Sequence, residues 1–139
     1  MRTGLVLSIA MFCCCLAACN QTETPPIDVA DAWVRKPVPP LDKTAGYFKI
    51  RNNTPSPVTL QKAVSPQARS IEFHETTREG DMTRMRRMSS LTIGPGEQAV
   101  FEPGGKHLMI FGFTEDKSLA MITLQFESGK TLDVPFELR

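Results

Sequence analysis

Two alternating stretches near the end of the chain decide the fold: AMITLQF at residues 120–126 and TLDVPFEL at residues 131–138. Every second residue is apolar from Ile122 to Phe126, and again from Leu132 to Phe136. Side chains on a β-strand point alternately to its two faces, so each stretch has one face suited to a core. Because Pro135 lacks an N–H donor, it predicts an edge position or a bulge in the last strand.

The same succession of strand and turn runs through the chain from Ile27 onward. Turn residues cluster at 52–55, 79–81, 94–96, 103–105 and 128–129. We expect a helical turn near 66–70 or 115–119, but no window of helical length carries an amphipathic stripe. Many short strands indicate an all-β sandwich or barrel. The candidate strands are Val29–Arg35, Gly46–Arg51, Val58–Val64, Ser70–Thr77, Thr83–Met88, Gln98–Phe101, Leu108–Gly112, Ala120–Phe126 and Thr131–Leu138.

The start of the chain has the layout of a secretory leader. An apolar run from Leu5 to Leu16 follows Met1-Arg2, and it is too short to span a membrane, which takes about 20 apolar residues. The sequence Leu16-Ala17-Ala18-Cys19 resembles the lipobox of bacterial lipoproteins, which implies cleavage before a lipidated Cys19. An ordinary cleavage or an uncleaved anchor remains the alternative. We therefore expect a signal peptide at 1–18, a lipidated tether at 19–26 and one β-sandwich domain at 27–139.

Cysteine and charge counts exclude several kinds of function. The four cysteines are Cys13, Cys14, Cys15 and Cys19, so the domain from Ile27 onward has no thiol. This excludes a thiol catalyst, a disulfide, a Cys-based zinc site and a blue-copper site. Removing Arg2 with the leader leaves 15 basic and 15 acidic residues without a basic stripe. Nucleic-acid binding is therefore not expected.

The two histidines of the chain both lie near methionines. His107 and Met109 are two residues apart, so on a strand they share a face about 6–7 Å apart. Ile71 and Phe73 form the apolar face of their strand, which turns His74 to the other side. Imidazole nitrogen with neutral thioether sulfur favours copper(I), a soft ion. The alternatives are surface histidines and methionines that fill the core, as we expect for Met121.

The spacing of these residues resembles a known signature. His74, ten residues, Met85, twenty-one residues, His107, one residue and Met109 match the His-x10-Met-x21-His-x-Met pattern of the periplasmic copper chaperone family PCuAC. Neighbouring segments are also similar, among them 32–35, 45–48, 71–75, 103–109 and 124–127, and the resemblance covers residues 27–139. It implies a cupredoxin-like Greek-key β-sandwich that binds one copper(I) through His74, Met85, His107 and Met109.

The same resemblance implies a carrier rather than an enzyme. Members of the family deliver copper to respiratory oxidase assembly, at the copper centre of cytochrome c oxidase, alongside Sco-type proteins. We thus expect a monomeric, lipid-anchored periplasmic chaperone whose partner is a copper-accepting oxidase subunit or a Sco-type protein. An exposed site would release copper by ligand exchange. The rivals are a metal-free structural or adhesive β-sandwich lipoprotein and a copper-dependent oxidase.

Two features depart from the family pattern. Some members carry a His- and Met-rich C-terminal tail that binds copper(II), whereas this chain ends at Arg139 without one, so no copper(II) role is expected. Some members have Met after the first histidine, where this chain has Glu75. Met82 and Met88 are possible substitutes, although neither ranks as a primary ligand.

Overall fold

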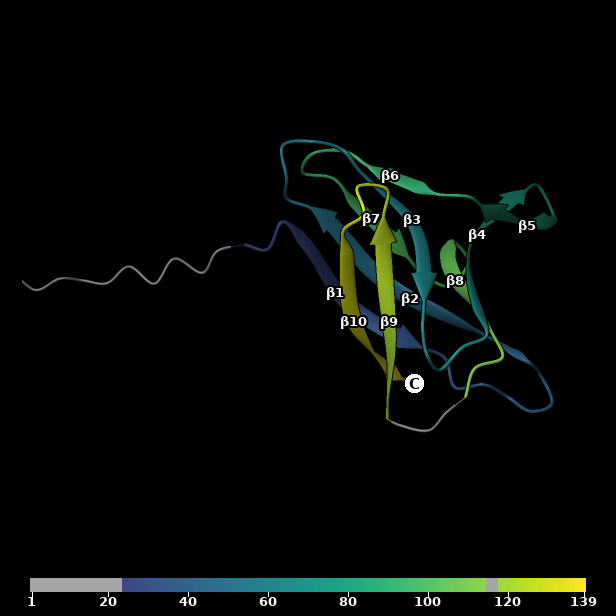
Figure 1. Ribbon diagram of the computed structural model, residues 1–139. Helices are drawn as coiled ribbons and strands as arrows, with labels where there is room; N and C mark the ends of the chain where they lie inside the picture. The colour runs from purple at the N-terminus through teal and green to yellow at the C-terminus, as the bar shows by residue number, and fades with distance from the viewer. Residues whose placement is uncertain (1–23, 115–117) are drawn as a thin grey trace, which may run out of the picture.

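The computed structural model describes residues 24–114 and 118–139, and within them it contains strands and turns but no helix (Figure 1). The leader, the lipobox and Cys19 lie outside the described residues, as does part of the second expected helical turn. The first expected helical turn is a plain turn between two strands. The strands are β1 (Ile27–Val34), β2 (Lys43–Asn52), β3 (Val58–Val64), β4 (Ser70–Glu79), β5 (Met82–Met88), β6 (Leu91–Ile93), β7 (Gln98–Phe101), β8 (Lys106–Phe111), β9 (Leu119–Phe126) and β10 (Thr131–Leu138).

These strands form one hydrogen-bonded sheet that curves back on itself. The order is β5-β4-β8-β7-β2-β1-β10-β9-β3-β6, with a further pairing of β8 to β2. β3 comes into contact with β4, so the two ends of the sheet lie close together and the sheet is nearly closed (Figure 1). Most pairings are antiparallel, whereas β1 with β10 and β7 with β8 are parallel. The all-β prediction is confirmed.

The core lies between the two halves of this sheet and follows the alternation seen in the sequence. Phe48 stacks on Phe101 with ring centroids 4.3 Å apart, and Phe136 meets Phe48 edge-on at 5.6 Å. Aromatic pairs in these arrangements add to the free energy gained by burying their surfaces. Every second residue of β9 is buried, from Ala120 to Phe126. Burial of these side chains holds both halves together and fixes which face of each strand points outward.

The sequence missed one strand, placed one side chain wrongly and predicted one proline in part correctly. Strand β6 was not predicted, because three residues are too few to show alternation. Met121 is 40% exposed rather than in the core, since β9 turns Ala120 and Ile122 inward. Pro135 lies in an interior strand with an unbroken register against β9, so it marks no bulge. Among the described residues, β1 pairs with β10 only at Glu137 and Leu138, so Pro135 itself is at a locally unpaired edge on that side.

A bulge in β1 was also missed by the sequence reading. The register between β1 and β2 shifts by one residue between Ala30 and Trp33. Asp31 lies inside this bulge with a φ of 53°, a left-handed conformation that aspartate tolerates better than most residues. Its carboxylate accepts a hydrogen bond from the Lys49 ammonium at 2.7 Å, and this contact lowers the pKa of Asp31. The bulge thus brings Trp33 opposite Tyr47, where the two rings pack at 4.5 Å.

Within residues 24–114 and 118–139, nothing forms a helix long and apolar enough to cross a membrane.

Candidate metal centre

Strands β4 and β8 bring the two histidines together. The antiparallel register places His74 directly opposite His107 and Glu72 directly opposite Met109. Opposed residues in an antiparallel pair lie on the same face of the sheet, as do residues two apart on one strand. His74, His107 and Met109 therefore share one face, and Phe73, Leu108 and Ile110 occupy the core face behind them.

Met85 lies on the same face but farther out. It is opposite Thr76, two residues beyond His74, on the neighbouring edge strand β5. Met109 is level with Glu72 and Met85 with Thr76, a separation of about 13 Å along the strand direction. The structure thus groups His74, His107 and Met109, whereas Met85 stands on the other side of the histidine pair.

The spacing of three between the methionines of β5 separates their faces. Met82 and Met88 each lie an odd number of positions from Met85, so both point to the opposite face of the sheet. Met88 is opposite Phe73 and packs against the core. Met82 is opposite Glu79 near the end of the strand and is 58% exposed. Neither methionine shares a face with the histidines.

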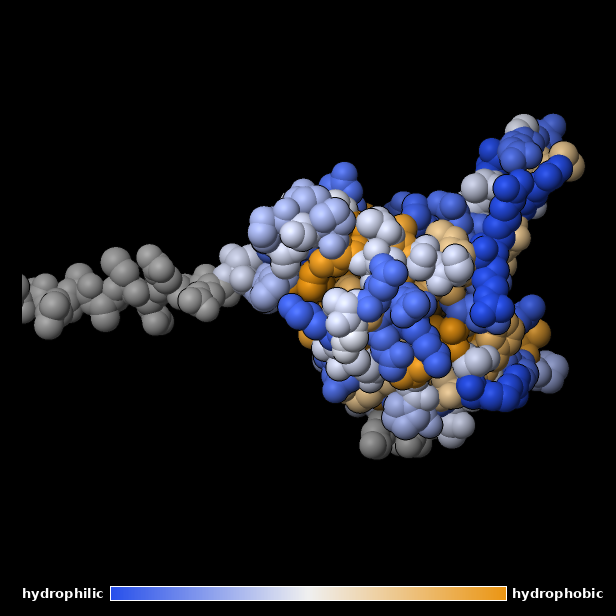
Figure 2. Space-filling model, turned by 45° about the horizontal axis from the view of Figure 1, so that its top comes forward, coloured by the Kyte–Doolittle hydropathy of each residue, from blue (hydrophilic) through white to orange (hydrophobic). Residues whose placement is uncertain are grey.

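The histidine pair is shielded from water, unlike the exposed site expected from the sequence. His107 is 5% exposed, and the side chain of His74 is 15% exposed. Met85 is 53% exposed. It sits on the hairpin arm, residues 76–85, which projects from the body of the domain as a mostly hydrophilic finger (Figures 1 and 2). Access to this face is therefore open at Met85 and restricted at the histidines.

Each histidine has one ring nitrogen engaged by a hydrogen-bond acceptor. His107 Nδ1 lies 3.1 Å from the carbonyl oxygen of Gly105, and His74 Nε2 lies 2.9 Å from Glu72 Oε2. His74 Nδ1 is buried and has no hydrogen-bond partner. The ring centroids of the two histidines are 5.8 Å apart. Two imidazoles that share one tetrahedral ion through bonds of about 2.0–2.1 Å have ring centres roughly 5–6 Å apart, so this spacing is compatible with a shared ion.

Charged side chains divide between the two faces of β4. Glu72, on the histidine face, pairs with Arg87 at 3.2 Å. Glu75 follows His74 in the strand and points to the opposite face, where it pairs with Lys106 at 2.9 Å. Glu75, the residue that departs from the family pattern, therefore lies on the opposite face of the sheet from His74.

The donor set on this face is soft. Among the described residues, no three His, Cys, Asp or Glu side chains come close enough to hold a metal ion. A hard cation such as calcium or magnesium, which needs several oxygen ligands, has no such site there. Imidazole and thioether donors suit copper(I) better than zinc, which prefers cysteine, histidine and carboxylate. Nδ1 of His74, which is buried and has no hydrogen-bond partner, is the ring nitrogen that remains available to a metal ion.

The sequence reading missed how Glu72 and Gly105 contact the histidines. Glu72 was not predicted as a partner of His74, although its position two residues before His74 places both on one face of the strand. The carbonyl of Gly105 left no signal, since any residue has a carbonyl. Only the turn conformation before β8 aims it at the His107 ring.

Sequence comparison gives two matches. The family described as "Putative lipoprotein LpqE-like" matches residues 27–138. A protein of Leifsonia xyli subsp. xyli, described as "Putative lipoprotein Lxx21020", is 30% identical over 112 residues. The alignment covers 78% of this chain and 66% of the relative, so the chain spans just under two thirds of that protein's length.

Structural comparison finds PCuAC domains. The copper-bound PCuAC domain of PmoF2 has a TM-score of 0.70 at 20% identity, covering 84% of this chain and 95% of the domain. The CuI form of DR1885 from Deinococcus radiodurans has a TM-score of 0.66 at 27% identity, covering 87% of this chain and 83% of that one. These comparisons confirm the resemblance to PCuAC and the cupredoxin-like β fold expected from it.

Proposed function

The chain belongs to the LpqE-like lipoprotein family, and from this premise we propose that it is a copper(I) chaperone of the periplasm. In this proposal His74, Met85, His107 and Met109 bind one copper(I) ion. The observation that carries it is the β4–β8 register, which sets His74 opposite His107 with Met109 on the same face. The similarity to DR1885, whose structure is of a CuI form, supports the choice of metal and oxidation state.

The chemistry of the four donors favours binding and release over catalysis. Thioether sulfur is neutral and needs no deprotonation, and in an oxidising compartment it forms no disulfide. Two sulfurs and two neutral imidazoles leave the ion with its single positive charge. No open coordination position remains for a substrate, which favours a carrier over an oxidase.

The geometry of the hairpin arm suggests how copper is taken up and handed on. His74, His107 and Met109 lie together, whereas Met85 must approach from the far side of the histidine pair. Copper binding is therefore proposed to draw the arm toward the histidines. Release begins at Met85, the exposed donor, because an acceptor's ligand can replace its thioether first.

The acceptor in this proposal is a protein that needs copper for respiration. By the family resemblance it is a cytochrome c oxidase subunit or a Sco-type protein, reached by the chaperone as a monomer. Lipidation of Cys19 would anchor the domain to the cell envelope membrane through the tether at 19–26. Membership in a lipoprotein family supports this anchor.

Copper(I) competition tests the proposed site. The full chain in detergent is titrated against a coloured copper(I) chelator, with the wild type expected to hold about one equivalent. Loss of an outer-shell partner costs about 10–100-fold in metal affinity, so Met85→Ala and Met109→Ala are expected to cost at least that much. Met82→Ala is the matched control, because Met82 is similarly exposed on the same strand but faces the other way. Absence of competition by the wild type would favour the metal-free lipoprotein.

Labelling with palmitate tests the anchor. The wild type is expected to incorporate label, whereas Cys19→Ser is expected to incorporate none. Cys15→Ser makes the same substitution within the leader and is expected to behave as the wild type. Equal labelling of the Cys19→Ser variant would contradict lipidation at that residue.

A further inference from the structure

The unsatisfied nitrogen of His74 points to a positioning role for Glu72. We propose that the Glu72 carboxylate holds His74 in one tautomer, so that copper(I) binds His74 through Nδ1 and His107 through Nε2. Arg87 in turn holds Glu72. The inference rests on the proposed copper function and specifies which atoms of the site bind the ion and which side chains aim them.

The hydrogen bond between Glu72 and His74 determines where the proton lies. The Glu72 carboxylate is paired with Arg87 at 3.2 Å, so it is an acceptor, and its other oxygen lies 2.9 Å from His74 Nε2. A carboxylate can only accept, so His74 Nε2 donates its proton to this contact. In the neutral ring Nδ1 then carries a bare lone pair. That atom is the buried nitrogen that has no partner in the structure.

A buried polar atom without a hydrogen-bond partner lowers the stability of the fold until a ligand satisfies it. Leaving such a group unpaired costs about 1–3 kcal/mol, and such atoms are rare in folded proteins. A soft metal ion would satisfy the Nδ1 lone pair. Metal-binding histidines commonly donate their second ring N–H to a carboxylate or a backbone carbonyl, which fixes the tautomer and the ring orientation.

His107 shows the same arrangement with the nitrogens exchanged. Its Nδ1 lies 3.1 Å from the carbonyl oxygen of Gly105, which can only accept, so Nδ1 donates and Nε2 carries the lone pair. One histidine is thus oriented by a side-chain carboxylate and the other by the backbone. Only the His74 partner can be altered by substitution without changing the backbone.

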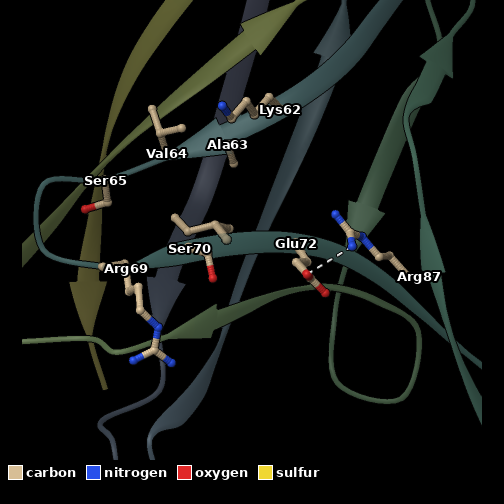
Figure 3. A pocket seen from close by; sticks show the side chains of 10 residues that line it. Lys62, Ala63, Val64, Ser65, Arg69, Ser70, Glu72 and Arg87 are labelled. Atoms are coloured by element: carbon tan, nitrogen blue, oxygen red, sulfur yellow. Dashed lines mark ion pairs between the residues drawn. The ribbon is translucent and has the colours of Figure 1, made fainter.

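Arg87 ties this carboxylate to the edge strand. It comes from β5, directly opposite His74, and reaches back to Glu72 on β4. Figure 3 shows the contact at one end of a groove of about 340 Å³ between β3 and β4, with Lys62, Ser65 and Arg69 farther along it. Arg87 is largely exposed in this groove, whereas Glu72 is mostly buried beside the ring. The pair therefore restrains Glu72 from the solvent side.

The first experiment reads the tautomers without metal. Long-range ¹H–¹⁵N correlation spectra of the metal-free protein are expected to show His74 protonated at Nε2 and His107 at Nδ1. In Glu72→Leu the His74 signals are expected to shift toward a tautomer mixture, while His107 keeps its pattern. A metal-free wild type with His74 protonated at Nδ1 would overturn the inference, whatever the protein does with copper.

The second experiment measures copper(I) affinity by chelator competition. Glu72→Leu is expected to weaken binding about 10–100-fold, the usual cost of losing an outer-shell partner. Glu72→Gln should recover part of this loss, because the amide oxygen can still accept from Nε2. Arg87→Gln should cost less than Glu72→Leu. Glu75→Gln is the matched control, since it removes a carboxylate and an ion pair on the opposite face and is expected to bind as the wild type.

The outcomes separate this inference from the copper function itself. A wild type that binds copper(I), together with a Glu72→Leu variant that is folded and binds equally tightly or more tightly, would overturn the positioning role alone. A wild type without copper binding would overturn the proposed function, whereas the tautomer spectra would still test the hydrogen bond. Thermal unfolding of each variant establishes that it is folded.

Discussion

Asn52 is a fully buried polar residue whose side chain has hydrogen-bond partners at both its nitrogen and its oxygen. Its side-chain amide donates to the carbonyls of Ser56, Ile93 and Gly94, and its oxygen accepts from the backbone and hydroxyl of Thr54. The residue is fully buried, so Asn52→Ala would remove one donor from each of these three carbonyls and the acceptor of the Thr54 N–H. We expect a loss of about 2–4 kcal/mol in the free energy of unfolding, measured with denaturant. Asn53→Ala, which breaks one exposed hydrogen bond, should cost under about 1 kcal/mol.

Methionine orientation on β5 makes a second prediction at the residue scale. Met85 faces the histidines and Met82 faces away, although both side chains are more than half exposed. With ¹³C-labelled methionine methyl groups, one equivalent of copper(I) is expected to shift the signals of Met85 and Met109. The signals of Met82 and Met121 should stay in place. A shift at Met82 larger than at Met85 would mean that the proposed ligand is the wrong methionine.

At the scale of elements, the end of β8 depends on a glycine. Gly112 has a φ of +58°, and a Cβ at this position would lie 2.9 Å from the Cβ of Arg69. Gly112→Ala therefore combines left-handed strain of about 1–2 kcal/mol with overpacking of about 1–3 kcal/mol. Gly129→Ala is the control, because Gly129 also has a positive φ but open space around it. Denaturant unfolding should show a clearly larger loss for Gly112→Ala, and equal losses would refute the steric contribution.

At the scale of the whole molecule, β10 joins the two halves of the sheet. It pairs with β1 on one side and β9 on the other, and Phe136 is fully buried against Phe48. We expect Phe136→Ala to cost about 3–5 kcal/mol, the range for truncating a buried phenylalanine. Leu119→Ala, at an exposed position of β9, should cost less than about 1 kcal/mol. Comparable losses in the two variants would mean that Phe136 contributes no more to the core than a surface residue.

Much of this molecule follows from patterns within single strands. Alternation and turn residues together predicted nine of the ten strands of the described residues, and alternation showed which side of β4 and β8 carries the histidines. The period of two is a local property, so it needs no knowledge of neighbouring strands. Where the local pattern was too short, as in β6, or interrupted, as at Asp31, the prediction failed. The fixed gaps between His74, Met85, His107 and Met109 indicated the family resemblance, and they too are visible without a structure.

The arrangement of the site depended on long-range pairing. The sequence by itself determined that His74 faces away from the core and that His107 and Met109 share a face. Only the tertiary structure set His74 opposite His107 and shielded both from water. It also left Met85 exposed on the hairpin arm and brought Glu72 and the Gly105 carbonyl within hydrogen-bond distance of the two imidazole rings. The physical reason is register: a strand fixes its own two faces, but which residues meet across strands depends on packing and hydrogen bonds between segments far apart in the chain.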